Sequence, residues 1–419
     1  MVPKLSRWAP LRVAREIRNF VSDPKPEIFH HISNVSLFQS YEYDIDRRLS
    51  MAARKLIVGL NPALQRRVEL KAPLQLGGVN RVVSSSEGWG GKGQDCAIAT
   101  AILAEDASSG AVLCQFLGRG AAGDALQCLL EASGVEVETP EALTVRTDGP
   151  LRVATTYVSA ADVDGIATEV VGAASAVTTE DCARMTALVH TCVTRTGRVG
   201  AVVVMGSSPP GVDESFVGSL IAAALRDGGS GKVVLDSVAA LHSNLAACAA
   251  LGASAVLKVN ADELLALAEN KSAIVTAHAG VDDQCSPRER RCCEAARVLL
   301  GAGSAALRHV AVTDGARPGL LFSRSADMGL QLWRVTLPTL SSLGLRVRNP
   351  IGAGDAVAAG FTAHWCEDCD IVAAFAFGLA CGAASCCTAR NSVFDVEVAR
   401  ALSEGAQVAG VGLASTSST

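Results

Sequence analysis

Short runs of apolar residues alternate with longer segments of helical period over most of the chain. The runs with the length of a buried strand are Lys55–Leu60, Val112–Leu117, Ala201–Met205, Val233–Leu235, Ala255–Val259 and Val310–Thr313. The segments of helical period between them include Glu214–Arg226, Ala261–Glu269 and Arg288–Leu300. Because a strand, a helix and a further strand in this order form a right-handed crossover, the pattern predicts an α/β fold with a mostly parallel sheet.

Two other stretches have a different pattern. Val68–Val83 and Arg152–Val171 alternate like exposed strands and have no helix-like segment within them. We therefore expect them to form a small β-lid over one edge of the sheet.

The two ends of the chain differ from the rest. Residues 1–54 interleave basic and apolar residues around a lone early acid, Glu16. This pattern resembles an organelle transit peptide, which would place the protein in a plastid or mitochondrion. An ordinary solvated extension of a cytoplasmic protein fits equally well, with Met51 as a candidate internal start. The Ser- and Thr-rich end, residues 406–419, predicts a disordered tail, so the folded domain is expected at 55–405.

Composition and charge exclude some classes of protein. Apolar residues make up 49% of the chain and aromatic residues only 4%, so the core must consist of Ala, Val and Leu, which suit helices packed closely on a parallel sheet. The formal charge of -5 argues against nucleic acid as the main partner. The uncharged stretch 371–389 is long enough for a membrane span, but its Ala, Gly, Cys and Ser content predicts a buried helix instead.

The 14 cysteines are scattered through a long chain, unlike the disulfide framework of a short secreted domain. They are expected to be small core residues in a reducing compartment. His364, Cys366 and Cys369 look like a fragment of a zinc site, but no second Cys-x-x-Cys pair accompanies them. An ordinary structural role is therefore favoured for these three residues.

The sharpest chemical signal is the tetrapeptide Gly352-Ala353-Gly354-Asp355, which opens a helix-like segment. A Gly-Ala-Gly turn at a helix start points free backbone N–H groups and the positive end of the helix dipole at one place, where an anion binds. Asp355 in the first turn can take a proton from an acceptor hydroxyl. Taken alone, the motif also fits a structural glycine-rich loop capped by the aspartate.

A second glycine-rich loop, Gly90-Gly91-Lys92-Gly93, precedes a small-residue helix. Paired glycines let a substrate approach the backbone, and the lysine offers positive charge to a phosphate. The loop is not a Walker A motif, because Ser86 stands at the first glycine position and Gly93 replaces Ser or Thr. No Gly-x-Gly-x-x-Gly comes directly after the first strand, Lys55–Leu60, which counts against a dinucleotide-dependent dehydrogenase.

These two motifs occur in a fixed order with four others. In chain order they are Asn-Pro-Ala-Leu at 61–64, Gly-Gly-Val-Asn-Arg at 77–81, Gly-Gly-Lys-Gly at 90–93, Gly-Ser-Ser-Pro-Pro-Gly at 206–211, Lys-Val-Asn-Ala-Asp-Glu at 258–263 and Gly-Ala-Gly-Asp at 352–355. Together they resemble the ribokinase/PfkB carbohydrate kinase family over about residues 55–405, and most of all its 1-phosphofructokinase and tagatose-6-phosphate kinase branch. The resemblance implies a ribokinase-like three-layer sandwich with a small β-lid. It also implies ATP along the carboxyl ends of the strands, a sugar acceptor beneath the lid, and a homodimer formed through the lid.

The resemblance also implies roles for individual residues. Asp355 is the expected base, with Gly352, Ala353 and Gly354 as the anion hole. Asn260 and Glu263 are expected to organise Mg²⁺ near the phosphates of ATP, although Glu263 also fits a helix first-turn carboxylate and both roles can hold at once. The expected nucleotide contacts are Thr313, Gly315 and Asn391. The expected acceptor contacts are Gly90, Gly91, Lys92, Ser207, Arg81 and Arg152, of which the last two also fit solvated lid residues.

Two departures from the branch concern the sugar pocket. Gln65 stands where the branch has an Asp that holds sugar hydroxyls, and Asp95 stands where it has an Asn. This pair is consistent with a swap that keeps one carboxylate in the pocket, so both residues are candidate acceptor contacts for an unusual acceptor.

The sequence therefore predicts an ATP- and Mg²⁺-dependent kinase that phosphorylates a sugar phosphate such as a hexose phosphate. One alternative is a kinase of an unphosphorylated sugar, polyol or nucleoside. Another is a sensor of nucleotide or sugar that has lost useful catalysis.

Overall fold

The computed structural model describes residues 54–104, 110–135, 142–159, 167–196, 199–226, 231–269, 285–302, 304–325, 329–367 and 369–411. The N-terminal extension expected at 1–54, except for its last residue, lies outside the described residues. So do residues 412–419 of the expected tail.

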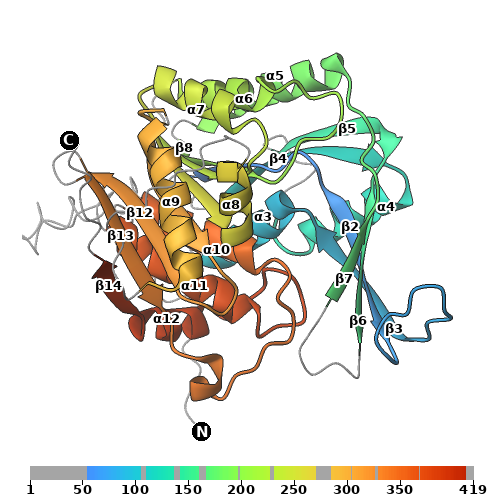
Figure 1. Ribbon diagram of the computed structural model, residues 1–419. Coiled ribbons are helices and arrows are strands. Elements are labelled where there is room, and N and C mark those ends of the chain that lie inside the picture. Colours follow the sequence, from blue (N-terminus) through green and yellow to red (C-terminus); the bar gives the residue numbers. More distant parts are fainter. Residues whose placement is uncertain are drawn as a thin grey trace, which may run out of the picture. The chain divides into compact units, whose positions relative to one another are not determined.

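A ten-stranded sheet lies at the centre of the described chain, with the strand order β14-β13-β12-β11-β10-β9-β8-β1-β4-β5 (Figure 1). The strands are β1 (Arg54–Val58), β4 (Ala111–Arg119), β5 (Leu143–Pro150), β8 (Val199–Met205), β9 (Lys232–Asp236), β10 (Ser254–Asn260), β11 (Leu307–Thr313), β12 (Gly319–Ser325), β13 (Gly329–Thr336) and β14 (Gln407–Val411). Neighbouring strands from β5 to β11 are parallel, and those from β11 to β14 are antiparallel. All six apolar runs overlap strands of the parallel part, so the expected fold class is confirmed.

The last strand corrects the expected boundary of the tail. Residues 407–411 were assigned to a disordered tail, but they pair with β13 from Thr336↔Gln407 to Leu332↔Val411. Most of β14 is exposed, so its sequence carries little of the apolar pattern that marks a buried strand. Its pairing is set by β13, a partner about seventy residues earlier, and local composition does not reveal such a contact.

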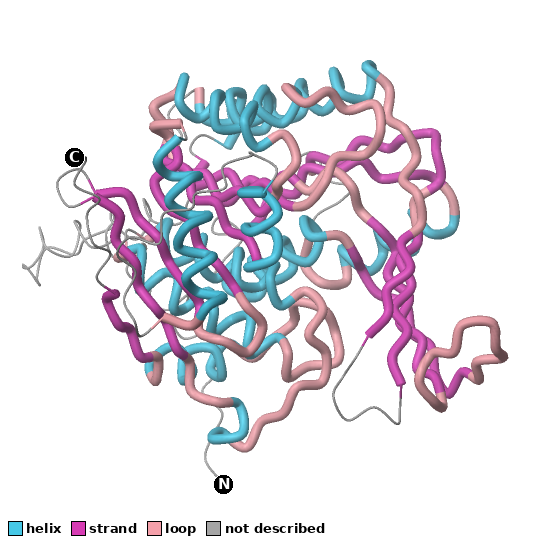
Figure 2. The backbone as a smooth tube through the Cα atoms, viewed as in Figure 1, coloured by secondary structure: helices cyan, strands magenta, loops and turns pink. Residues whose placement is uncertain are grey.

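Helices cover both faces of the sheet. One face carries α5 (Thr179–Thr196), α6 (Phe216–Leu225), α7 (Leu241–Ala250), α8 (Ala261–Glu269) and α9 (Pro287–Ala302). The other carries α3 (Lys92–Leu103), α4 (Ala121–Glu131), α10 (Ala353–Cys366), α11 (Ile371–Ser385) and α12 (Val396–Glu404). Figure 2 shows these helices around the sheet. The described part of the chain is thus the expected three-layer sandwich.

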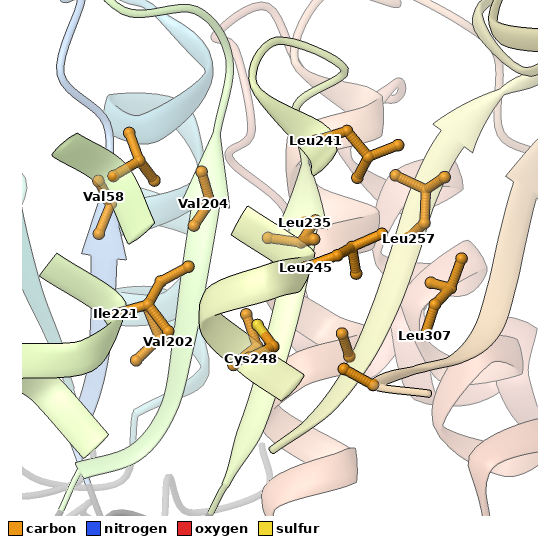
Figure 3. Close-up of a cluster of buried hydrophobic side chains, with 14 of the residues drawn as sticks. Val58, Val202, Val204, Ile221, Leu235, Leu241, Leu245, Cys248, Leu257 and Leu307 are labelled. Carbon is orange, nitrogen blue, oxygen red and sulfur yellow. The ribbon is translucent and has the colours of Figure 1, made fainter. Parts of the chain in front are cut away.

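Alternating residues of each strand divide the core into two clusters, one on each face. Val202 and Val204 of β8 pack with the first group of helices, whereas Val203 packs with the second. Figure 3 shows the first cluster, in which Ile221 and Leu245 lie over the strands. Because both faces are buried, the parallel strands read as continuous apolar runs.

The apolar stretch considered for a membrane span forms α11, which packs against α10. The helices approach closely because glycines face the contact: a Cβ on Gly378 would come within 2.7 Å of the backbone oxygen of Val357. Most of α11 is buried, as predicted. Among the described residues, no helix has the length and apolar character needed to cross a bilayer.

A separate four-stranded sheet forms the lid, in the order β3-β2-β6-β7. Its strands are β2 (Ala63–Leu70), β3 (Val82–Gly90), β6 (Val153–Ser159) and β7 (Ala167–Val171). The two stretches with exposed-strand patterns contribute most of it, with β2 beginning and β3 ending beyond the first stretch, and the strands extend away from the main sheet in Figure 1. Its outer strands carry exposed valines, among them Val82, Val83, Val170 and Val171.

Candidate active site

Parallel strands bring the predicted motifs to one edge of the main sheet. The carboxyl ends of β1, β8, β9, β10 and β11 lead directly into polar residues, most of which belong to the predicted motifs. These are Asn61, Ser207, Asp236, Asn260 and Thr313 in strand sequence order. Since ligands of open α/β sheets bind outside the carboxyl ends of the strands, this edge is where the site is expected.

The Gly-Ala-Gly-Asp motif forms the turn that begins α10. Gly352 is the N-cap with φ 78°, a left-handed conformation that favours glycine, and a Cβ there would lie 2.5 Å from Oγ of Ser392. The Ala353 and Asp355 amides bond back to the carbonyls of Pro350 and Gly352, at 3.3 and 3.1 Å. Within the described chain the Gly354 amide has no such backbone acceptor. A helix start with a free amide is suited to bind an anion.

Asp355 has the burial and the surroundings of a general base. Its side chain is buried, with 7% exposed. Burial, together with the nearby carboxylate of Asp236, raises the pKa of Asp355 to about 7, while Lys258 and Lys92 oppose this shift. A carboxylate with a pKa near neutrality can accept a proton at physiological pH and release it afterwards.

A charge network that the sequence analysis missed lies beside Asp355. Asp236, 1% exposed at the end of β9, accepts hydrogen bonds from Lys258 Nζ at 2.7 Å and from Lys92 Nζ at 3.0 Å. Although burial alone would raise the pKa of Asp236, the two ammonium groups lower it. The available signal was an acid that ends the apolar run Val233–Leu235, at the edge where the other motifs lie.

Asn260 and Glu263 form a reciprocal capping box at the start of α8. The Glu263 amide donates to Asn260 Oδ1 at 2.8 Å, and the Asn260 amide donates to Glu263 Oε2 at 2.9 Å. Lys92 Nζ lies 3.2 Å from Glu263 Oε1. Asn260 and Glu263 therefore cap the N-terminus of α8, the structural role considered for Glu263 from the sequence. Its partly exposed oxygens are also the hard donors that suit Mg²⁺, which usually keeps several waters when proteins bind it.

Several predicted acceptor residues line one cavity of about 290 Å³. Its lining residues are Gly59, Asn61, Lys92, Gly93, Gln94, Arg152, Met205, Gly206, Ser207, Asp236, Ser237, Val238, Ala239 and Glu263. Arg152 donates to the backbone oxygens of Asn61 and Pro62 at 2.6 and 3.2 Å, and Ser207 Oγ accepts from Asn61 Nδ2 at 3.1 Å. The cavity thus brings Lys92, Arg152 and Ser207 together.

The paired glycines lie where the lid sheet joins helix α3. Gly90 ends β3 next to Gln65, and Gly91 is the N-cap of α3 with φ 103°. A Cβ on Gly91 would lie 3.1 Å from Cα of Pro62 and would also collide with the Gln94 side chain. Lys92 therefore begins α3 with its ammonium group directed at Asp236 and Glu263.

Other predicted acceptor contacts lie elsewhere. Gln65 on β2 donates from Nε2 to Thr156 Oγ1 at 2.5 Å, within the lid sheet. Arg81 is exposed at the far end of the lid hairpin, where Leu70 pairs with Val82. It is one whole strand, about 30 Å of extended chain, from Gly90. The structure does not bring Arg81 to the cavity of its own chain.

The predicted nucleotide residues belong to two separate parts of the chain. Thr313 ends β11, and Gly315 follows in a left-handed turn at φ 59°. Asn391 accepts from Asn349 Nδ2 at 2.9 Å through Oδ1, and from Trp89 Nε1 at 3.3 Å through its backbone oxygen. Asn391 therefore contacts the loop that leads into Gly352.

Of the three residues considered for zinc, His364 makes a packing contact. The His364 ring stacks on Phe377 with 3.7 Å between ring centroids. Within the described ranges, no group of three or more metal-binding side chains is arranged to hold a metal ion.

Comparison with known proteins identifies the family. The family model described as pfkB family carbohydrate kinase matches residues 64–393. No curated protein matched the sequence. Among solved structures, phosphofructokinase-2 of Escherichia coli with substrates and products has a TM-score of 0.63 and 22% identity, covering 84% of this chain and 98% of its own. A possible 1-phosphofructokinase of Thermotoga maritima has a TM-score of 0.62 and 20% identity, covering 86% and 100%.

A ribokinase of Cryptococcus neoformans in complex with ADP is similar as well, with a TM-score of 0.59 and 18% identity over 83% of this chain and 98% of its own. At these identities the structures share the fold, whereas the family match spans most of the chain and includes the glycine loop and the buried aspartate. The chain therefore belongs to the pfkB family of carbohydrate kinases and is a phosphotransferase that acts on an alcohol group, with ATP as co-substrate.

Proposed function

We propose that this kinase transfers the γ-phosphoryl group of ATP to a primary hydroxyl of a sugar phosphate such as a hexose phosphate, with Asp355 as the base. The observation that carries the proposal is the position of Asp355. It is buried in the first turn of α10, next to the free Gly354 amide, with a pKa of about 7.

The step divides among these residues as follows. The Asp355 carboxylate takes the proton of the acceptor hydroxyl as its oxygen bonds to the γ-phosphorus and the bond to the β–γ bridging oxygen breaks, which releases ADP. The Gly352–Asp355 turn faces the charge that develops on the transferring group. Asn260 and Glu263 would hold Mg²⁺ through its waters, and the ion would neutralise charge between the phosphates.

Lys92 lies between Asp236 at the end of β9 and Glu263 at the start of α8. Its ammonium group contacts Asp236 at 3.0 Å and Glu263 at 3.2 Å, and these carboxylates raise its pKa against the opposing effect of burial. A permanently charged lysine in the acceptor cavity can follow the phosphoryl group as it moves from donor to acceptor. Arg152 and Ser207 line the same cavity and are the proposed contacts for the acceptor phosphate.

One observation favours a second candidate, a kinase of an unphosphorylated sugar, polyol or nucleoside. Arg81 lies far from the cavity, and Arg152 already donates to two backbone carbonyls. Among the described residues, few cations then remain at the cavity for a dianionic acceptor, which needs fixed positive charge.

The test is ADP release from Mg-ATP across a panel of phosphorylated and free sugars, polyols and nucleosides, with wild type and Asp355→Asn in parallel. Turnover of fructose 1-phosphate, fructose 6-phosphate or tagatose 6-phosphate that Asp355→Asn abolishes is the expected result. Turnover of unphosphorylated acceptors alone would establish the second candidate. Near-normal turnover by Asp355→Asn would rule out the base, and ATP binding without turnover of any acceptor would favour a sensor.

A further inference from the structure

Trp89 is the buried end of the lid strand β3. Residues 82–87 of that strand are exposed, but Trp89 is 4% exposed and packs in the core cluster that contains Ala356 and Val357 of α10. The paired glycines that follow it lead into α3, whose first turn carries the candidate acceptor residue Asp95, 4% exposed and outside the described lining of the acceptor cavity. Trp89 therefore anchors the lid strand in the same core cluster as the helix that carries the proposed base.

The indole ring of Trp89 also contacts the segment that follows α11. Its Nε1 donates a hydrogen bond to the backbone oxygen of Asn391 at 3.3 Å, although the two residues are 302 positions apart in the sequence. Cζ of Arg390 lies 5.9 Å from the centroid of the Trp89 ring, within the range of a cation–π contact. The proposed mechanism uses neither contact. Together they join the lid strand to residues 390 and 391.

The same segment holds the turn at the start of α10. Asn391 Oδ1 accepts from Asn349 Nδ2 at 2.9 Å, and Asn349 Oδ1 accepts from the Ile351 amide at 3.1 Å. Ser392 Oγ donates to the Gly352 carbonyl at 2.8 Å. A Cβ on Gly352 would lie 3.2 Å from the Cβ of Asn391, so the segment lies directly against the turn. The lid strand is thereby linked to the anion-binding turn through printed contacts of one short segment.

Ser392 has a strained backbone conformation within that segment. Its φ is 54°, in the left-handed region that serine rarely adopts, and its side chain is fully buried. Such a conformation persists only where the surrounding contacts hold it. Among the described contacts, the bond from Trp89 holds the segment on the side of the lid, and the bond from Ser392 to Gly352 holds it on the side of the turn.

We propose that Trp89 is a positioning residue for phosphoryl transfer. Its indole N–H fixes residues 389–392, which in turn hold the Gly352–Asp355 turn in the geometry that receives the transferring group. Because Trp89 belongs to the lid strand, the turn is held in this geometry only while the lid strand keeps its place. This inference rests on the proposed function, in which the turn faces the transferring phosphoryl group.

Hydrogen exchange of backbone amides, followed by mass spectrometry, tests the link in the full chain without substrates. Trp89→Phe keeps an aromatic ring but removes the N–H donor. Exchange in residues 349–356 should become about two- to tenfold faster, the factor expected for the loss of one neutral hydrogen bond, whereas exchange in β8 and β9 should stay at the wild-type rate. Trp333→Phe is the matched control, because Trp333 on β13 packs against the same core cluster, and it should leave residues 349–356 unchanged.

A double-mutant cycle tests whether Trp89 acts through this segment. Ser392→Ala removes the hydrogen bond to the Gly352 carbonyl and leaves the donor of Trp89 in place. If both side chains act on the turn through one segment, the increase in exchange in the double variant should be smaller than the product of the two single increases. Independent, multiplicative effects would overturn the proposal.

The kinetic measurement uses any acceptor that the substrate panel identifies. Trp89→Phe should lower kcat by about two- to tenfold and change the KM of the acceptor little, because the turn acts on the transferring group. Unchanged kcat, unchanged exchange in residues 349–356, or exchange that accelerates equally in β8 and β9 would each overturn the proposal. If the exchange results hold and no acceptor is turned over, the link from Trp89 to the turn stands while the proposed function fails.

Discussion

Lys258 and Asp236 form a buried ion pair beside the catalytic loop, with 2.7 Å between Nζ of the lysine and Oδ2 of the aspartate. The two side chains are 4% and 1% exposed. A Cβ on Gly354 would lie 2.9 Å from the same ammonium group, so the pair adjoins the anion-binding turn. The pair therefore places a carboxylate from β9 and an ammonium group from β10 beside the start of α10.

Lys258→Met should lower the free energy of unfolding. It should also raise the pKa of Asp355, so that less of this carboxyl group is ionised at neutral pH. Removing Lys258 leaves the buried Asp236 with only the partly exposed Lys92 as a partner, so the loss should fall below the value of about 3–5 kcal/mol typical of a buried charge left without any partner. Because Lys258 lowers the pKa of Asp355, its loss should move the acid limb of the pH–rate profile to higher pH. Urea unfolding and kcat against pH measure the two effects.

The control for this variant is a pair on the lid surface. Arg66 and Glu87 lie 2.8 Å apart with 47% and 44% of their side chains exposed. Arg66→Met should change the free energy of unfolding by less than about 1 kcal/mol. Equal losses of stability in both variants would contradict the argument from burial.

The sequence carried most of the information about the sheet and the glycine loops. Buried parallel strands must be apolar on both faces, and a left-handed turn such as that at Gly352 requires glycine, so both leave a local signature. The position of Asp236 at the end of an apolar run is such a signature, but its pairing with Lys258 and Lys92 leaves none, since the partners come from a separate strand and a helix. Their proximity follows only from the order of strands in the sheet.

The same reasoning explains what the sequence left open. Arg81 belongs to a family motif, but its distance from the cavity depends on the length of β3, which a motif does not encode, so its role as an acceptor contact stays a prediction. Strand β14 is mostly exposed and is held by its partner, so composition alone suggested a tail. Gln65 was expected beside the acceptor, and its bond to Thr156 depends on the parallel pairing of β2 with β6.

The free energy of unfolding should depend on pH through Asp355. Its pKa in the folded protein is about 7, against an ordinary value of 3.8. A carboxyl group with a raised folded pKa contributes stability below its unfolded pKa and loses it as the pH rises through the folded value. Between about pH 5 and pH 8 wild type should therefore lose a few kcal/mol that Asp355→Asn retains. Parallel pH dependence in the two proteins would show that Asp355 titrates normally.

Gly352→Ala tests the geometry of the anion-binding turn. The residue has φ 78°, and a Cβ would come 2.5 Å from Ser392 Oγ. Gly344 provides a matched control, since its φ is 69° but nothing lies within 4 Å of its Cβ position. Both variants should lose about 1–2 kcal/mol of stability from the left-handed conformation. Only Gly352→Ala should also lose kcat, by about tenfold or more, because the turn that stabilises the transferring group is displaced.

Arg152→Met distinguishes a phosphorylated acceptor from a free one. The Arg152 guanidinium lies in the acceptor cavity, where burial lowers its pKa. If it binds the acceptor phosphate, its removal should raise KM for a sugar phosphate by about ten- to a hundredfold, the cost of one charge-assisted contact, and leave KM for ATP unchanged.

Arg81→Met, at the far end of the lid, should leave the KM of both substrates near wild type if the site is complete within one chain. A rise in acceptor KM for Arg81→Met instead would mean that this arginine reaches a site, which the geometry within one chain does not permit. A second copy of the chain would then have to supply it.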